Sequence, residues 1–123
     1  MHKPTFWNVA RDREGPICFW CGGAICHRTA SFDHVVPRAL NGSSNRHNVV
    51  LSCLDCNNMR SRITSIYVQI TRYRKRKLRR SHEYEWLSPH LLVFRQRIET
   101  MLIGQQLAVC LKELETVQEF IDG

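Results

Sequence analysis

The sequence has no long apolar run, and this absence narrows the class of protein. No stretch approaches the roughly eighteen consecutive apolar residues that a membrane-spanning helix needs. The first fifteen residues, MHKPTFWNVARDREG, contain no apolar signal-peptide core. We therefore expect no membrane partner and a cytoplasmic location. Disulfides are disfavoured in that compartment, and cysteine pairs there more often hold a metal ion.

Internal repeats and low-complexity linkers are also missing. With 123 residues, the chain is expected to form one domain, or one domain with an appendage. A hydrophobic content of 43% predicts a globular fold rather than disorder. A chain of this length buries only about two thirds of its extended surface, so its core is modest and an additional cross-link would stabilise it.

The charge is distributed unevenly along the chain. Residues 1–86 hold 15 Lys and Arg against 6 Asp and Glu, a net charge of +9, whereas residues 87–123 hold 3 against 5, a net charge of −2. A basic body with a mildly acidic tail predicts a polyanionic partner for the body alone. A basic surface without a partner is the simpler alternative.

Four of the six cysteines form two C-x-x-C pairs, Cys18 with Cys21 and Cys53 with Cys56. Two residues between cysteines let both thiolates reach one ion, and two such turns supply the four sulfurs of a structural zinc site. Zinc would stabilise so small a domain, because zinc-finger peptides bind the ion with about 10–16 kcal/mol. Redox chemistry is the alternative, but the βαβ pattern typical of a redox C-x-x-C is missing.

The two remaining cysteines have other expected environments. Cys110, between Val109 and Leu111, is predicted to be a small core residue. Cys26 with His27 is kept as an alternative source of a zinc ligand.

The hydrophobic pattern predicts an α+β fold. Alternating apolar positions in SFDHVV and the short run VVLSC predict two strands of a hairpin. From residue 57 apolar residues recur every three or four positions, which predicts a helix that runs into residues 72–80. Ser88 as N-cap and Pro89 as first helical residue predict one or two further helices up to residue 121. A short helix is also expected over residues 5–13.

A shared zinc ion would bring polar residues of these elements together. With the segment between the cysteine pairs pinned at both ends, FDHVVP and RHNVVL become neighbouring strands, and the helix leaves the second pair. Asp33, His34, Asn48 and Asn57 can then converge between hairpin and helix. Each alone has a simpler interpretation: a surface hydrogen bond for Asp-His, a turn for Asn48 and a helix N-cap for Asn57. Their joint order and spacing favour a site.

These residues resemble an HNH endonuclease of the zinc-knuckle form. The motifs are Cys18-x-x-Cys21-Gly22, Asp33-His34-x-x-Pro37, Asn48-x-x-Leu51, and Cys53-x-x-Cys56-Asn57 with Arg60. The resemblance spans roughly residues 6 to 66. It implies a small ββα-metal, treble-clef-like core that a four-cysteine zinc site holds together, with a helical C-terminal extension.

The resemblance also implies a role for each matching residue. Asp33 would bind a catalytic divalent ion, and His34 would be the general base that activates water for attack on a phosphate. Asn48 would orient the imidazole or tie the loop. Asn57 stands where the family's name-giving histidine often lies, and its amide oxygen suits magnesium or manganese. Asn58 is the alternative ligand if the helix is rotated.

The stretch RYRKRKLRR, residues 72 to 80, carries seven cations in nine positions. On a helix these cations surround the cylinder, which predicts an arm that follows phosphates and gives affinity rather than sequence choice. A solvated helix end is the alternative. The candidate nucleic-acid-binding residues are Arg60, Arg62, Arg72, Arg74, Lys75, Arg76, Lys77, Arg79 and Arg80.

The chain is accordingly divided into an HNH nuclease domain with its basic helix, residues 1–80, and a helical extension, residues 81–123. The extension has an apolar stripe that must be buried. Packing on the core is favoured, and a homodimer or another protein partner through residues 88–121 are the alternatives.

The sequence thus predicts a metal-dependent DNA endonuclease that hydrolyses phosphodiester bonds, with structural zinc and catalytic magnesium or manganese. The alternative is a zinc-knuckle nucleic-acid-binding module without catalytic activity. The presence of both Asp33 and His34 favours the enzyme, because a binding module needs neither. Small proteins of this resemblance are associated with phages, mobile elements and bacterial defence, so the expected setting is a bacterial cell or a phage-infected host.

Overall fold

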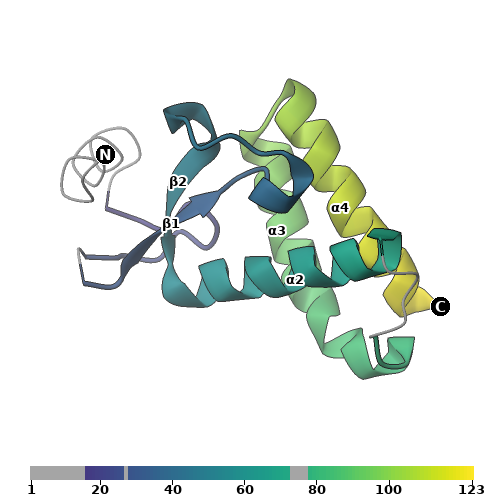
Figure 1. Ribbon diagram of the computed structural model, residues 1–123. Coiled ribbons are helices and arrows are strands. Elements are labelled where there is room, and N and C mark those ends of the chain that lie inside the picture. Colours follow the sequence, from purple (N-terminus) through teal and green to yellow (C-terminus); the bar gives the residue numbers. More distant parts are fainter. Residues whose placement is uncertain (1–15, 27, 73–77) are drawn as a thin grey trace. The chain divides into compact units, whose positions relative to one another are not determined.

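The computed structural model describes residues 16–26, 28–72 and 78–123 (Figure 1). The chain forms two compact units, residues 1–58 and residues 59–123. Helix α2, Leu54–Arg72, begins in the first unit and continues into the second. The functional division at residue 80 stays a prediction. The short helix expected over residues 5–13 lies outside the described residues.

The first unit contains a two-stranded antiparallel sheet. Strand β1, Ala30–His34, pairs with β2, Val49–Cys53, and this register places Asp33 opposite Val50 and His34 opposite Val49. Val49, Val50 and Leu51 are buried, as expected for β-branched and aliphatic residues on a small sheet. The predicted hairpin is confirmed.

Helix α2 follows β2 without a connecting loop. Its first residue is Leu54, three residues before the predicted start, because the second C-x-x-C pair straddles the end of the strand and the first turn of the helix. The two strands, this first turn and a cluster of four cysteines make an α+β arrangement consistent with a ββα-metal fold.

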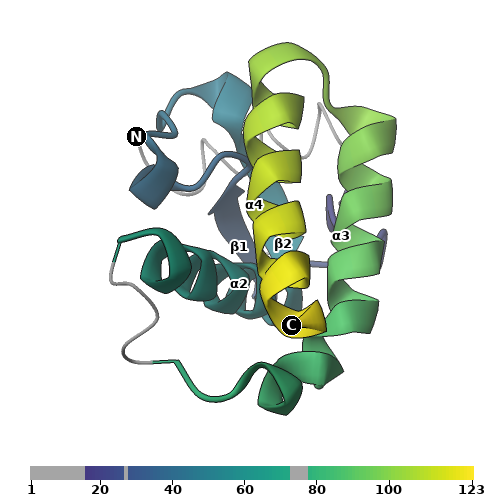
Figure 2. The same ribbon diagram turned by 90° about the vertical axis from the view of Figure 1, so that its right-hand side faces the viewer.

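The second unit contains the rest of α2, the 3-10 helix η3, Ser81–Leu87, and helices α3, Ser88–Met101, and α4, Gly104–Asp122. Helices α3 and α4 run side by side in opposite directions, as a two-residue connection requires (Figures 1 and 2). The predicted apolar stripes are largely buried, and Cys110 is buried with them. The buried residues of these stripes include Ile63, Ile66, Leu91, Phe94, Ile98, Leu114, Val117 and Ile121.

One predicted helix boundary is wrong. Ser88 does not cap α3: the N-cap is Leu87, and no side chain makes a capping bond there. The reason is that η3 leads directly into α3, so its last turn supplies the preceding helical backbone and leaves no open helix start. Pro89 does lie in the first turn, where its missing N–H costs nothing.

A buried ionic network joins α2 to α4 inside the second unit. The guanidinium Nη1 of Arg60 lies 2.7 Å from Oε1 of Glu113, and both residues are buried, at 1% and 0% exposure. The Thr64 hydroxyl lies 2.6 Å from the other carboxylate oxygen of Glu113. Nη2 of Arg60 also lies 3.7 Å from the sulfur of Cys110. Polar groups so deeply buried need such partners, because each would otherwise lose its hydration without replacement.

Within the ranges that the structure describes, every helix is too short or too polar to cross a membrane.

Candidate functional site

The four cysteines of the two C-x-x-C pairs meet in space. Their sulfur atoms all lie within 4.8 Å of one another. Cys18 and Cys21 come from the turn before β1, Cys53 is the last residue of β2, and Cys56 lies in the first turn of α2. Zinc–sulfur bonds of about 2.3 Å in a tetrahedron require sulfur–sulfur distances of about 3.8 Å, so a small adjustment would let all four bind one ion.

Backbone hydrogen bonds explain why the first pair forms a tight knuckle. The N–H of Cys18 donates to the carbonyl of Gly23 at 2.8 Å, and the N–H of Gly22 donates back to the carbonyl of Cys18 at 2.9 Å. Gly22 has a φ of +75°, a conformation that glycine adopts without strain. The N–H of Phe19 donates to the carbonyl of Leu51 at 2.9 Å, which anchors the knuckle on β2.

The environment of the sulfurs fits a metal ion. Amide groups already point at two of them: the N–H of Gly23 lies 3.4 Å from the sulfur of Cys21, and that of Cys56 lies 3.4 Å from the sulfur of Cys53. Burial raises the pKa of Cys56 and Cys21, and negative charge on the neighbouring cysteines raises both further. Four thiolates this close would repel one another, and a bound cation would compensate that repulsion. Four sulfur donors from two turns are typical of a closed structural zinc site.

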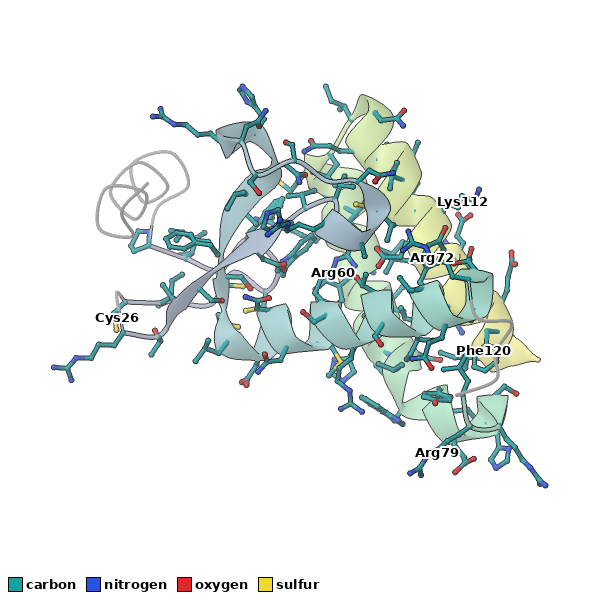
Figure 3. All side chains as sticks on the ribbon, viewed as in Figure 1. Cys26, Arg60, Arg72, Arg79, Lys112 and Phe120 are labelled. Carbon is teal, nitrogen blue, oxygen red and sulfur yellow. The ribbon has the colours of Figure 1, made fainter. Side chains whose placement is uncertain are left out.

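Cys26 lies at the tip of the turn before β1 and is exposed (Figure 3). Its N–H donates to the Thr29 hydroxyl at 3.0 Å, a turn contact outside the four-sulfur cluster. The cluster is complete without the alternative ligand considered from the sequence. His27 lies outside the described residues.

At the end of β1, Asp33 is buried and oriented by an indole. Oδ2 of Asp33 accepts a hydrogen bond from Nε1 of Trp20 at 2.9 Å. Trp20 is itself buried against Phe19, with ring centroids 4.9 Å apart. A core aromatic next to the first knuckle therefore orients the carboxylate, a contact that the sequence analysis did not predict.

Asn57, in the first turn of α2, reaches back to β1. Its amide nitrogen donates to the hydroxyl of Ser31 at 2.9 Å and lies 3.4 Å from the carbonyl of Phe32. Side chains alternate along a strand, so Ser31 and Asp33 leave β1 on the same side. The structure thus brings Asn57 to the side of the strand that carries Asp33. Because these contacts engage the amide nitrogen, the amide oxygen is the atom left to face a cation.

His34 is the last residue of β1 and is half-buried. Its Nε2 lies within hydrogen-bond distance, 3.2 Å, of the hydroxyl of Ser44 in the following loop. Burial lowers the pKa of His34, and the charge of Arg38 acts in the same direction. The imidazole is therefore held mainly in its neutral form at pH 7, the form that can accept a proton.

Asn48 ties the loop between the strands. Its side-chain oxygen accepts from the N–H of Val36 at 2.8 Å, and its side-chain nitrogen donates to the carbonyls of Val36 at 2.9 Å and Ser43 at 2.8 Å. A Cβ added to Gly42 would stand 1.7 Å from the carbonyl oxygen of Val36, so only glycine fits this turn. Of the two roles expected for Asn48, these bonds correspond to tying the loop that presents Ser44.

Ser44 was not singled out by sequence reasoning. It lies in a stretch of pure loop composition, ALNGSSNRHN, and nothing in that composition separates Ser44 from Ser43. The pairing depends on the exact path of the loop, which the Asn48 bonds and the close approach at Gly42 determine.

The candidate nucleic-acid-binding residues fall into three groups. Arg60 is buried and paired with Glu113, so it cannot offer its guanidinium to a phosphate, and we leave it out of the proposed surface. Arg62, Arg72, Arg79 and Arg80 are exposed in the second unit (Figure 3 labels Arg72 and Arg79). Residues 74–77 lie outside the described residues.

Asn58, the alternative metal ligand, is exposed.

The features that the sequence resemblance implies are a strand-end aspartate and histidine, a helix amide and a four-cysteine cluster. The family model for HNH endonuclease matches residues 18–62, which begin at the first cysteine and include all of these residues. The resemblance is therefore confirmed for this segment, which is just over a third of the chain.

Two curated relatives are similar to the same part of the molecule. The CRISPR-associated endonuclease Cas9 of Actinomyces naeslundii is 42% identical over 53 residues, which are 42% of this chain and 5% of that protein. The CRISPR-associated endonuclease Cas9 of Corynebacterium diphtheriae is 43% identical over 47 residues, 37% of this chain and 4% of that protein. The chain thus corresponds to a small fraction of each of these relatives.

Proposed function

We propose that this chain is a metal-dependent nuclease that hydrolyses phosphodiester bonds in DNA. The observation that carries the proposal is the match of residues 18–62 to the HNH endonuclease family, because every residue of the proposed site lies in that segment. The names of the two relatives, both endonucleases, support the same class of activity. The basic composition of residues 1–86 supports a polyanionic substrate.

In this proposal His34 is the general base. A neutral imidazole near the end of β1 would take a proton from water as the water oxygen attacks the phosphorus. The lowered pKa of His34 keeps this form available at neutral pH. The contact with Ser44 would hold the ring in one orientation, so that the other ring nitrogen faces the water.

Asp33 and Asn57 are the proposed ligands of a catalytic divalent ion. They offer a carboxylate oxygen and an amide oxygen, a hard donor set that suits magnesium or manganese. When bound, such an ion stabilises the negative charge that develops on the phosphate oxygens and on the leaving oxygen. Trp20 orients the carboxylate of Asp33, and Ser31 orients the amide of Asn57.

The four cysteines are proposed to bind a separate, structural zinc ion. A closed set of four sulfurs leaves no coordination position for water or substrate. The proposed zinc site therefore holds the knuckle, β2 and α2 together, whereas the reaction takes place at the oxygen ligands.

Incubation with a supercoiled plasmid tests the proposed activity. Zinc-loaded protein is mixed with plasmid in buffer containing magnesium, manganese or neither, and the supercoiled, nicked and linear forms are quantified. We expect nicked or linear DNA only when a divalent ion is added. Tight plasmid binding without any cleavage under all three conditions would favour the alternative, a nucleic-acid-binding module without catalytic activity.

A further inference from the structure

An exposed tryptophan in the second unit carries an arginine on its ring. The guanidinium carbon of Arg62, on α2, lies 4.6 Å from the ring centroid of Trp86, on η3. This distance is within the range of a cation–π contact. The ring of His90, on α3, meets Trp86 edge-on, with centroids 6.2 Å apart and planes at 76°. Although these two residues contact it, Trp86 remains 42% exposed.

These contacts fix the orientation of the indole. Arg62 lies over the ring, and the plane of the His90 ring is nearly perpendicular to that of the indole, so His90 does not stack on Trp86. A single exposed aromatic side chain is common on protein surfaces. Trp86 differs from such a residue because Arg62 and His90 already restrict the rotation of its ring. A ligand that binds to the ring therefore loses less free energy in ordering it.

The surroundings of Trp86 favour an anionic ligand. The second unit holds 12 Lys and Arg against 7 Asp and Glu, a net charge of +5. Of the acidic residues closest in sequence, Glu83 accepts from the N–H of Arg80 at 3.1 Å and pairs with Arg79 at 3.7 Å. Glu85 is adjacent to Trp86 in sequence. Successive residues of a 3-10 helix point about a third of a turn apart, so the side chains of Glu85 and Trp86 leave the helix in different directions.

We propose that Trp86, with Arg62, forms a stacking platform for an unpaired base, so that the second unit binds single-stranded nucleic acid. Every base has a flat π face that can stack on the face of the indole opposite Arg62, and the Arg62 guanidinium on the other face supplies a cation for the neighbouring phosphate. A base within a duplex is already stacked on its neighbours and has no face to offer. The proposal therefore extends the proposed function, on which it rests for the class of ligand, by specifying the form of the nucleic acid.

A docking surface for another protein is the competing possibility, because the exposed face of α3 also carries Leu92 and Val93. The guanidinium on the indole and the net positive charge of the unit favour nucleic acid over an apolar partner. A ligand that stacks on the indole would bind more weakly when an aliphatic residue replaces Trp86. An apolar protein partner would be much less sensitive to that replacement.

Binding measurements on the whole 123-residue chain test the platform. In a His34→Ala background without magnesium, the Kd for a fluorescent 12-nucleotide single strand and for a 12-base-pair duplex is measured by anisotropy at constant salt. Trp86→Leu removes the π face but keeps an apolar side chain, Trp86→Phe keeps a smaller π face, and Leu92→Ala is the control on the neighbouring exposed surface. Zinc content and melting temperature establish that each variant is folded.

We expect Trp86→Leu to raise the Kd for the single strand about 5- to 160-fold, the usual effect of losing one stacked base. Trp86→Phe should recover most of that loss, and Leu92→Ala should have no effect. The Kd for the duplex should change less than about twofold in all variants. An unchanged single-strand Kd in Trp86→Leu, an equal loss for both ligands, or a change only in self-association on gel filtration would overturn the platform. If Trp86→Leu does not fold, Arg62→Gln decides the question: it should weaken binding of the single strand more than binding of the duplex, and an unchanged ratio of the two Kd values would refute the proposal.

The outcome is independent of the plasmid experiment. The binding measurement uses a variant without the proposed general base, so it does not require cleavage. A protein that binds single strands through Trp86 but never cuts a plasmid would retain the platform and lose the proposed nuclease activity. A protein that cuts a plasmid but binds single strands equally well without Trp86 would support the nuclease activity and refute the platform.

Discussion

Hydrogen bonds to individual atoms determine which parts of the proposed catalytic side chains remain available for chemistry. Asn57 uses its amide nitrogen on β1, and His34 has Nε2 against the hydroxyl of Ser44. In both residues the contact engages one polar side-chain atom, and the other polar atom can take part in the proposed chemistry. A carboxylate held by Trp20 completes a site whose side chains are oriented by their neighbours rather than by their own rotamer preferences.

The role of Ser44 is testable by removing its hydroxyl. A lost neutral hydrogen bond is worth about 0.5–1.5 kcal/mol, so Ser44→Ala should lower the single-turnover cleavage rate about 2- to 12-fold without changing zinc content. Ser43→Ala is the matched control, because Asn48 contacts only the main-chain carbonyl of that residue among the bonds described above. Equal rates for Ser44→Ala and the unmodified protein would exclude a positioning role for Ser44.

Most residues of the proposed site were expected from residue order alone, and their roles stay predictions. Asp33, His34 and Asn57 stand in recognisable motifs, and Asn48 was expected to tie the loop or orient the imidazole. Trp20 and Ser44 could not be found in this way. Both act through side-chain contacts between segments distant in sequence, and such contacts follow from the packed knuckle and from the loop path rather than from spacing.

At the scale of elements, the second unit depends on a buried ion pair between α2 and α4. Arg60 and Glu113 have almost no contact with solvent, so each compensates the other's lost hydration. Such a pair stabilises the fold less than its short distance suggests, because its attraction mostly offsets the cost of desolvation. Removing one member of the pair destabilises the fold strongly, because it leaves the other charge buried without a partner.

This reasoning predicts strong non-additivity. Arg60→Met should lower the free energy of unfolding by about 3–5 kcal/mol, whereas the double variant Arg60→Met with Glu113→Leu should recover most of that loss. Urea unfolding followed by circular dichroism measures both. As a control, Arg95→Met removes an exposed pair with Glu99 and Glu115 and should cost at most about 1 kcal/mol. Additive losses in the double variant would show that the pair is not the coupled unit inferred from the structure.

The helices themselves follow from apolar spacing, as do the strands from alternation. The network at Arg60 does not, because a charged residue at the start of a basic helix is typical of a solvated surface. Its burial depends on Thr64 from the next helical turn and on Glu113 from a distant helix, and no local pattern pairs the three. For the same reason the start of α3 was misassigned: the capping signal at Ser88 is genuine in sequence, but η3 precedes it.

At the scale of the whole molecule, a chain of 123 residues is expected to need the proposed zinc ion for its stability. The four-sulfur cluster links the knuckle, β2 and the first turn of α2, which are the elements that position Asp33 and Asn57. Cys53→Ser should therefore reduce bound zinc and lower the melting temperature sharply, because zinc binding and folding are coupled in small domains. Metal analysis and a thermal melt check this, with Cys26→Ser as the exposed control. Wild-type protein that contains no zinc and resists strong chelators would remove the basis for this prediction.

The central claim is that His34 is the base in metal-dependent phosphodiester hydrolysis, and single-turnover cleavage measures it most directly. Zinc-loaded His34→Ala and unmodified protein are compared on the same DNA at saturating protein and magnesium. His47→Ala, which removes an exposed histidine from the segment between β1 and β2, is the control. The account predicts a rate about 10²- to 10⁴-fold lower for His34→Ala, with zinc content, melting temperature and DNA affinity unchanged. Cleavage by His34→Ala at the unmodified rate would contradict it.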